Sequence, residues 1–183
     1  MNYKEGIEQI LGEIRRCLSQ VEEEEIYDAA RTIISAKRVF VEGVGRSGLV
    51  AATFAMRLSQ MGIITYVVAE TTTPSIQKDD LLIICSGSGE SDSLITHAQT
   101  AKKLQALVML YTANASSEIG CSSDYQIVIS APKKYEIETA SMQPMGTLFE
   151  QSVTIAFDIT ILELMKQMNL SSKQMYKNHK NLE

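Results

Sequence analysis

Three serines and two glycines lie where one apolar run of the sequence ends and a helical pattern begins. This SGSGES stretch follows the apolar run 80–85 and precedes a predicted helix over 91–104. Unpaired N–H groups at a helix start attract anions, serine hydroxyls add donors, and glycines let the backbone approach a ligand. The stretch therefore predicts a phosphate-binding turn, with an ordinary capped turn as the alternative. Its residues are Ser86, Gly87, Ser88, Gly89, Glu90 and Ser91.

A second glycine-rich turn, GVGRSG at 43–48, follows the β-rich run 38–42. It satisfies the GxGxxG pattern of dinucleotide-binding sites, and Glu70 falls near the place of a ribose-binding acid. Arg46, however, puts a bulky charge into this turn, and two phosphate turns on adjacent strands better suit a compact phosphorylated ligand. We expect Ser47 and Arg46 to reach the phosphate oxygens or hydroxyls of that ligand. A nucleotide-binding oxidoreductase is the competing interpretation, and a surface salt bridge is the competing role for Arg46.

Glu150 is a carboxylate in an otherwise apolar predicted helix over 146–168. Partial burial would raise its pKa toward the range of a useful general base, so Glu150 is the candidate for proton transfer. The alternative is a carboxylate that is favoured only by the positive end of the helix dipole.

Composition limits the classes of partner. The chain has 183 residues, 45% of them hydrophobic, which suits one domain with a sizeable core. Its 17 basic and 22 acidic residues give a net charge of -5 without a basic stripe, so we expect no nucleic-acid partner. No apolar run is long enough to span a membrane, and the first ten residues do not resemble a signal peptide. We therefore expect a cytoplasmic protein with no membrane partner.

Cysteine and histidine usage argues against a disulfide framework and a metal site. Cys17, Cys85 and Cys121 show no CxxC spacing, and we interpret them as small buried hydrophobic residues. The two histidines, His97 and His179, form no ligand pattern, so we expect no metal. His97 is expected to be structural or solvated.

Hydrophobic periodicity predicts two helices, over 3–20 and 22–36, before the first strand. Five short β-rich runs then alternate with segments able to form helices. Apolar strands in this pattern indicate a parallel sheet covered on both faces, which is a three-layer α-β-α sandwich of the flavodoxin-like α/β class. Right-handed crossovers place the strand-to-helix turns at one edge of this sheet, where we expect the site. The five runs are 38–42, 64–69, 81–85, 106–111 and 125–130.

We expect a single domain over 1–183, with amino-terminal helices (1–36), a core (37–168) and a carboxyl-terminal tail (169–183). The predicted helix 146–168 is apolar on nearly every face, so we expect another subunit to bury part of it. The segment 131–142 is the only long connection without clear periodicity, and loops of this length are often functional.

Five motifs in order give the chain a specific resemblance. They are GVGRSG at 43–48, AETTTP at 69–74, SGSGES at 86–91, QPMGTLFEQ at 143–151 and NHKNLE at 178–183. From about residue 39 to its end, the chain resembles the sugar isomerase (SIS) family, most closely the 6-phospho-3-hexuloisomerases of the ribulose monophosphate pathway. It departs from their pattern in a shorter segment 131–142 and in the pair Ser91-Asp92, where a threonine-containing pair is frequent.

The resemblance implies a cofactor-independent isomerase that interconverts D-arabino-hex-3-ulose 6-phosphate and fructose 6-phosphate through a cis-enediol, within a homotetramer. It also implies that Glu150 is the proton acceptor. His179 matches a tail histidine associated with ring opening or proton transfer to oxygen, with a flexible tail residue as the alternative. Which subunit supplies His179 is left open. Two other functions are also open: a different phosphosugar aldose–ketose isomerase, and a non-catalytic phosphosugar-binding module.

Overall fold

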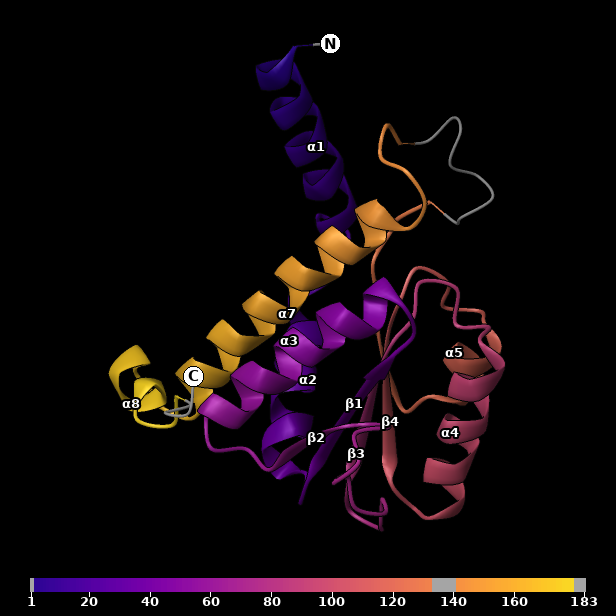
Figure 1. Cartoon of the computed structure of the whole chain (residues 1–183), viewed down its shortest axis with the longest axis vertical. Helices are drawn as coiled ribbons and strands as arrows, with labels where there is room; N and C mark the ends of the chain where they lie inside the picture. Colours follow the sequence, from indigo (N-terminus) through magenta and orange to yellow (C-terminus); the bar gives the residue numbers. More distant parts are fainter. Residues whose placement is uncertain (1, 133–140, 180–183) are drawn as a thin grey trace.

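The centre of the molecule is a five-stranded parallel sheet with the strand order β2-β1-β3-β4-β5 (Figure 1). The computed structural model describes residues 2–132 and 141–179. This strand order is that of the flavodoxin-like doubly wound folds, so the predicted fold class is confirmed. The strands are β1 (Val39–Gly43), β2 (Thr65–Val67), β3 (Leu81–Cys85), β4 (Leu107–Thr112) and β5 (Tyr125–Val128).

The helices divide into two layers (Figure 1). Helices α4 and α5 cover one face of the sheet, while α2, α3 and α7 cover the other, and α1 extends from that second layer away from the sheet. The helices are α1 (Tyr3–Leu18), α2 (Glu23–Ser35), α3 (Arg46–Gln60), α4 (Asp92–Lys103), α5 (Glu118–Ser122), α7 (Thr147–Gln167) and α8 (Ser172–Tyr176).

Side chains of the strands alternate between two apolar clusters, one on each face of the sheet. Leu81 and Ile83 of β3 pack toward the layer that contains α3 and α7, whereas Leu82 and Ile84 pack toward α4. All four side chains are 3% exposed or less, because helices cover both faces. A continuous apolar run such as that of β3 is therefore what this position in the sheet requires.

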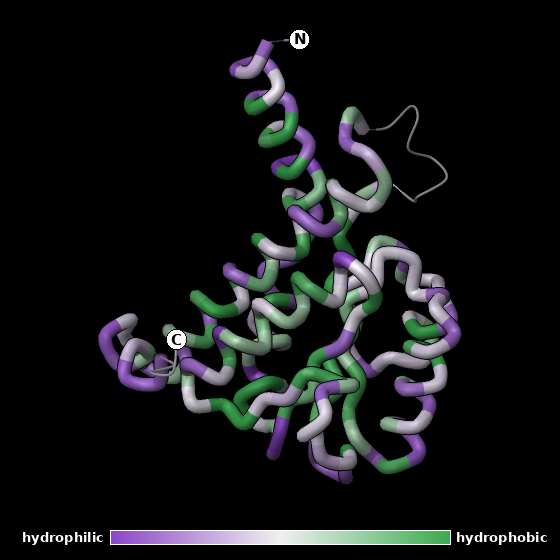
Figure 2. Tube along the Cα trace, viewed as in Figure 1, coloured by the Kyte–Doolittle hydropathy of each residue, from purple (hydrophilic) through white to green (hydrophobic). Residues whose placement is uncertain are grey.

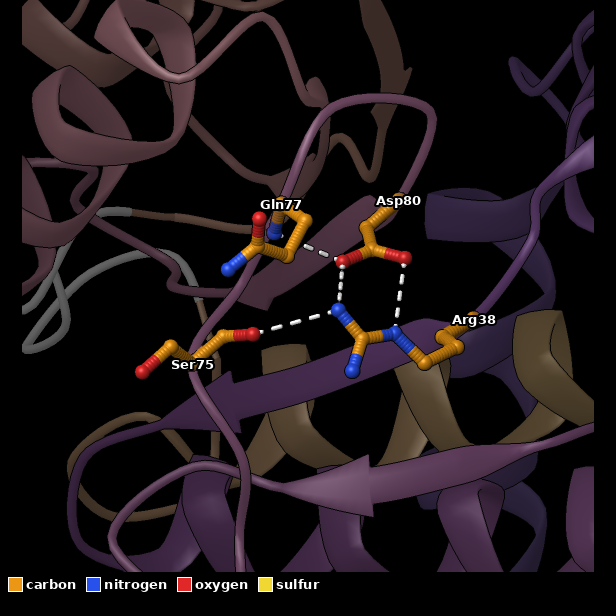
Figure 3. A network of polar contacts seen from close by, with 4 residues as sticks. All are labelled: Arg38, Ser75, Gln77 and Asp80. Carbon is orange, nitrogen blue, oxygen red and sulfur yellow. Dashed lines mark hydrogen bonds and ion pairs between the residues drawn. The ribbon is translucent and has the colours of Figure 1, made fainter.

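An ion pair fixes the edge of the sheet at which the strands begin (Figure 3). Asp80, just before β3, is fully buried, and it accepts hydrogen bonds from Arg38 Nε at 3.0 Å and from Gln77 N at 2.7 Å. Arg38, just before β1, also donates to the carbonyl oxygen of Ser75. A buried carboxylate needs such partners, and here they align the starts of the two central strands.

The observed elements differ from the predicted ones mainly at their ends. Strand β2 is shorter than the run 64–69, and within the predicted tail 169–183 the residues Ser172–Tyr176 form α8. Cys17 and Cys85 are buried as expected, but Cys121 is exposed, so that part of the cysteine interpretation was wrong. Cys121 lies on α5, which buries Ile119 and Gly120 and leaves Cys121 exposed to solvent.

The long helix α7 is buried on most of its surface but not all. Its central residues Val153 and Phe157 are at most 2% exposed, and the Phe157 ring stacks on Phe54 of α3 with centroids 4.2 Å apart. On another face, Ile159 and Leu162 are 42% and 63% exposed. Along α1, hydrophobic and hydrophilic residues alternate (Figure 2), and Leu11 on that helix is 54% exposed. Both helices thus carry apolar surface that this single chain leaves uncovered.

Candidate active site

A cavity of about 200 Å³ lies at the edge where the parallel strands end. The register aligns Gly43 at the end of β1 with Cys85 at the end of β3, and Cys85 with Tyr111 of β4. The turns that follow these strands therefore meet, as expected for ligand sites in doubly wound sheets. The lining residues are Val44, Ser47, Cys85, Ser86, Gly87, Ser88, Ser91, Leu94, Ala113, Asn114, Pro132, Gly146, Phe149 and Glu150.

Hydrogen bonds within the serine-rich turn and from β4 hold that turn in a fixed shape. The Ser86 hydroxyl accepts from the backbone N–H of Gly89 at 3.1 Å, and the Asn114 side chain donates to the Ser88 carbonyl at 3.2 Å. The hydroxyl of Thr112 donates to the carbonyl oxygen of Gly87. The turn is therefore organised without a ligand, which reduces the entropic cost of binding one.

Two helices direct their amino-terminal ends toward this cavity. Helix α3 starts beside Ser47 and α4 starts beside Ser91, and both of these serines line the cavity. No side chain caps the start of either helix. Their first N–H groups and the positive ends of both helix dipoles thus favour an anion such as a phosphate.

Glu150 reaches the same cavity from the first turn of α7. Its side chain is 11% exposed, and the carboxylate forms an ion pair with Arg46, whose Nη1 lies 3.1 Å from Glu150 Oε2. The same Arg46 nitrogen donates to the hydroxyl of Thr147 at 2.9 Å. A contact across about a hundred residues of sequence thus joins the first glycine-rich turn to the carboxylate.

Cys85 lies on the cavity floor but is a poor nucleophile. Complete burial, together with the nearby Glu150 carboxylate, raises the pKa of its thiol well above the ordinary value. A thiol that stays protonated does not attack a substrate, so Cys85 contributes shape and low polarity rather than reactivity.

The structure separates the predicted phosphate-binding residues into two groups. Ser47, Ser86, Gly87, Ser88 and Ser91 line the cavity. The other three predicted residues, Arg46, Gly89 and Glu90, are not among the lining residues.

Gly89, Glu90 and Arg46 act beside the cavity rather than in its wall. Gly89 takes a positive φ of 66°, which shapes the turn, and Glu90 accepts a hydrogen bond from the N–H of Glu118 at the start of α5. Arg46 contacts the cavity through Glu150.

In space, His179 lies far from the cavity of its own chain. It follows α8, beyond the carboxyl end of α7, whereas Glu150 is near the amino end (Figure 1). Its neighbour Asn178 donates to the carbonyl oxygen of Gln60, the last residue of α3, while the cavity adjoins the first turn of that helix. Helix α3 is roughly 20 Å long, so His179 does not reach the cavity of its own chain.

Sequence reasoning missed Asn114 and Phe149 as cavity residues. Asn114 follows β4, so the expected sheet topology was a signal that could have identified it. Phe149 lies next to Glu150 and packs against Gly87, where a Cβ atom would be 3.1 Å from its ring. Only the packing of α7 against the turn makes that contact visible.

Most of the segment 131–142 lies outside the described residues. In the described ranges, no three His, Cys, Asp or Glu side chains form a group that could hold a metal ion, and the absence of a metal stays a prediction. No helix in those ranges is long and apolar enough to cross a membrane.

The fold and the site together define a phosphosugar-binding class of protein. The SIS domain matches residues 32–159, and the chain belongs to this family. The resemblance inferred from the five motifs is thereby confirmed.

Particular relatives narrow the comparison further. The chain is 40% identical to a 3-hexulose-6-phosphate isomerase of Bacillus subtilis, and the alignment covers 100% of both chains. It is 41% identical to a 3-hexulose-6-phosphate isomerase of Methanocaldococcus jannaschii over 82% of this chain and 79% of the relative. A crystal structure from Methanococcus jannaschii, which infers a molecular function of 3-hexulose-6-phosphate isomerase, superposes with a TM-score of 0.85 at 36% identity and covers 98% of this chain and 99% of that one.

Proposed function

We propose that this protein is a 3-hexulose-6-phosphate isomerase, which interconverts D-arabino-hex-3-ulose 6-phosphate and D-fructose 6-phosphate. The observation that carries the proposal is the buried Glu150 carboxylate beside a preformed anion-binding turn in one cavity. Full-length similarity to relatives with this activity supports the same reaction.

Moving the ketone from C3 to C2 needs a base and a way to hold the phosphate. Glu150 removes the proton from C2 while O3 gains a proton, which gives the cis-enediol. O2 then loses its proton, and Glu150 returns a proton to C3. One carboxylate on one face of the substrate can do both transfers, so no redox cofactor is required.

The phosphate of the substrate binds at the starts of α3 and α4. Ser47, Ser86, Ser88 and Ser91 present hydroxyls there, and the two helix starts present N–H groups. Neutral donors and helix dipoles suit a dianion in a protein whose net charge is negative.

Arg46 orients the proposed base and stabilises charge that develops during the reaction. Its guanidinium touches Glu150, so it holds the carboxylate in one orientation and lies close to the developing charge of the enediolate.

We also propose a single SIS domain per subunit and a homotetramer in which His179 of one subunit serves the cavity of another. The exposed Ile159 and Leu162 on α7 supply apolar surface for such a contact. His179 would move protons between O2 and O3 or assist closure of the fructose 6-phosphate ring. We also propose a role in the ribulose monophosphate pathway, where formaldehyde fixation, formaldehyde detoxification and the supply of pentose phosphates are the alternative purposes. The cytoplasmic location stays a prediction.

The first experiment is a coupled assay that generates the hexulose 6-phosphate in situ and detects fructose 6-phosphate. We expect robust activity for the wild type and a loss of about two orders of magnitude or more in kcat for Glu150→Gln, because the amide cannot accept the C2 proton. Asp158→Asn, a change at an exposed position of the same helix, is the matched control and should retain activity.

Each other outcome has a defined meaning. Full activity in Glu150→Gln would assign the base elsewhere and keep the reaction. A folded wild type that binds sugar phosphates but does not isomerise this substrate would favour another phosphosugar isomerase or the non-catalytic binding module.

A further inference from the structure

Helix α1 extends away from the sheet, yet one of its carboxylates is almost fully buried (Figure 1). Glu13 is 4% exposed and accepts three hydrogen bonds from the segment that precedes α7. Ser141 Oγ and Gln143 Nε2 donate to Oε2 at 2.8 and 3.1 Å, and Met142 N donates to Oε1 at 3.0 Å. Buried carboxylates are costly unless they are paired in this way.

The three donors keep Glu13 in its charged form. Burial by itself raises the pKa of this carboxyl, but the hydrogen bonds from Met142, Ser141 and Gln143 outweigh burial and hold the pKa below its ordinary value. An ionised carboxylate only accepts hydrogen bonds, so it matches a site that presents three donors.

We call the three hydrogen bonds from residues 141–143 to Glu13 the Glu13 clamp. The segment 141–143 that it holds leads directly into the active site. Five residues after Ser141 comes Gly146, which lines the cavity and caps α7, and one turn later comes Glu150. On the other side of residues 133–140, Ser130 Oγ donates to Gln20 Oε1 at 2.7 Å, shortly after the end of α1. The amino-terminal region therefore holds the described chain on both sides of this connection.

We propose that Glu13 is a positioning residue for the isomerase reaction. It fixes residues 141–143 and thereby the first turn of α7, where Thr147 and Glu150 bind Arg46. Glu13 itself does not line the cavity. The inference rests on the proposed function, because it takes Glu150 as the base.

This role predicts a specific kinetic signature. The phosphate-binding turn 86–91 is held by β4 and Asn114 rather than by α1, so loss of the Glu13 clamp leaves phosphate binding intact. The carboxylate on α7 moves instead, and small displacements of a base are costly to the chemical step. The clamp therefore acts on kcat and leaves KM almost unchanged.

The test compares Glu13→Gln with the matched control Glu8→Gln on the exposed side of the same helix. The introduced glutamine is uncharged and has one acceptor oxygen in place of two, so it cannot accept all three hydrogen bonds in the geometry of the carboxylate. We expect kcat to fall about tenfold with KM changed less than twofold. A displacement of the Glu150 carboxylate by well under about 1 Å is enough to slow proton transfer by this factor. Glu8→Gln should match the wild type in both constants.

A second variant distinguishes positioning from a general loss of stability. Gln143→Met keeps the shape of the side chain and removes its donor to Glu13. We expect a smaller loss of kcat in Gln143→Met alone, and no additional loss when it is combined with Glu13→Gln, because both changes break the same clamp.

Hydrogen exchange gives a readout that does not depend on activity. In Glu13→Gln the amides of 141–150 should exchange faster than in the wild type, while those of 86–91 should not. Unchanged exchange at 141–150, or a kcat equal to that of Glu8→Gln, would overturn the inference. A wild type without isomerase activity would overturn the proposed function, and the exchange pattern would then still decide whether Glu13 positions α7.

Discussion

At the scale of single residues, the serine-rich turn depends on one glycine that does not line the cavity. Gly89 has a φ of 66°, and a Cβ atom there would collide with the side chain of Ser117. Ser117 is fully buried and its hydroxyl caps α5 by accepting from Gly120 N, so it has no room to move away. The glycine is therefore required by backbone conformation and by close packing together.

Gly89→Ala should destabilise the protein and weaken the proposed phosphate site. We expect the free energy of unfolding to fall by about 2 kcal/mol or more, because the left-handed conformation alone costs roughly 1–2 kcal/mol in alanine and the collision adds to it. Urea denaturation measures this loss. Gly62→Ala is the control: Gly62 also has a positive φ, of 85°, but a Cβ atom there would meet only the Asn178 side chain at 3.8 Å, an ordinary contact distance, so its loss should be smaller. Equal losses in both variants would contradict the packing argument.

At the scale of elements, a contact between Glu42 and His97 joins β1 to α4. His97 Nδ1 lies 2.7 Å from Glu42 Oε1, while Oε2 of the same carboxylate is buried without a hydrogen-bond partner among the described residues. Burial raises the pKa of Glu42, and the hydrogen bond to His97 offsets only part of that effect. His97 thus contacts a strand end while its side chain is 46% exposed, in line with the expectation that it is structural or solvated.

The raised pKa of Glu42 gives a pH-dependent prediction. A carboxyl whose pKa is higher in the folded state contributes stability below its ordinary range and loses that contribution as pH rises through the raised pKa. A glutamine at this position does not titrate. The stability of Glu42→Gln relative to the wild type should therefore increase as pH rises from about 4 and then level off, as measured by urea denaturation at several pH values. A difference in unfolding free energy between Glu42→Gln and the wild type that stays constant with pH would contradict the burial argument.

The element scale also shows what pattern reasoning could supply. Strand β3 was predicted at its observed bounds, because a buried run flanked by polar residues has clear ends. Strand β2 is an edge strand with partly exposed side chains, and its ends were placed less well. Helix α8 gave no clear signal, since none of its five residues is buried.

At the scale of the whole molecule, the uncovered apolar surface favours assembly. A groove of about 440 Å³ runs between α2 and α7 and is lined in part by Ile159 and Leu162. Exposed aliphatic residues on a helix whose other faces are buried are typical of subunit contacts. The proposed tetramer would cover this surface.

Leu162→Glu should reduce the size of the assembly. A buried, unpaired carboxylate opposes association, so we expect light scattering to show a smaller species than the proposed wild-type tetramer. Leu104→Glu, at the end of α4 on the other side of the sheet, is the control and should leave the mass unchanged. A wild-type monomer would contradict the proposed assembly.

Mixing two inactive variants tests whether sites are shared between subunits. If His179 serves the cavity of another subunit, Glu150→Gln and His179→Ala should each be impaired as pure proteins. Hybrids of the two should regain part of the activity, since some cavities then combine an intact Glu150 with an intact His179. Hybrids are formed by co-expression and assayed beside the separate variants. Activity no higher than the mean of the two would argue against a shared site.

The sequence by itself determined the fold class and the nature of the ligand site. Buried strands, helix periodicity and glycine-rich turns are set by neighbouring residues along the backbone, so their types and order could be predicted. The parallel topology then put both predicted phosphate-binding turns at one edge of the sheet. Five of the predicted phosphate-binding residues line the cavity for this reason.

Only the tertiary structure decided which of these groups meet. The Arg46–Glu150 pair, the use of Glu90 at the start of α5, and the burial of Glu13 against residues 141–143 each join distant parts of the chain. The distance of His179 from its own cavity depends on the length of α7 and the docking of the tail on α3. Such contacts are set by how helices pack on the sheet, and no local pattern of residues specifies that packing.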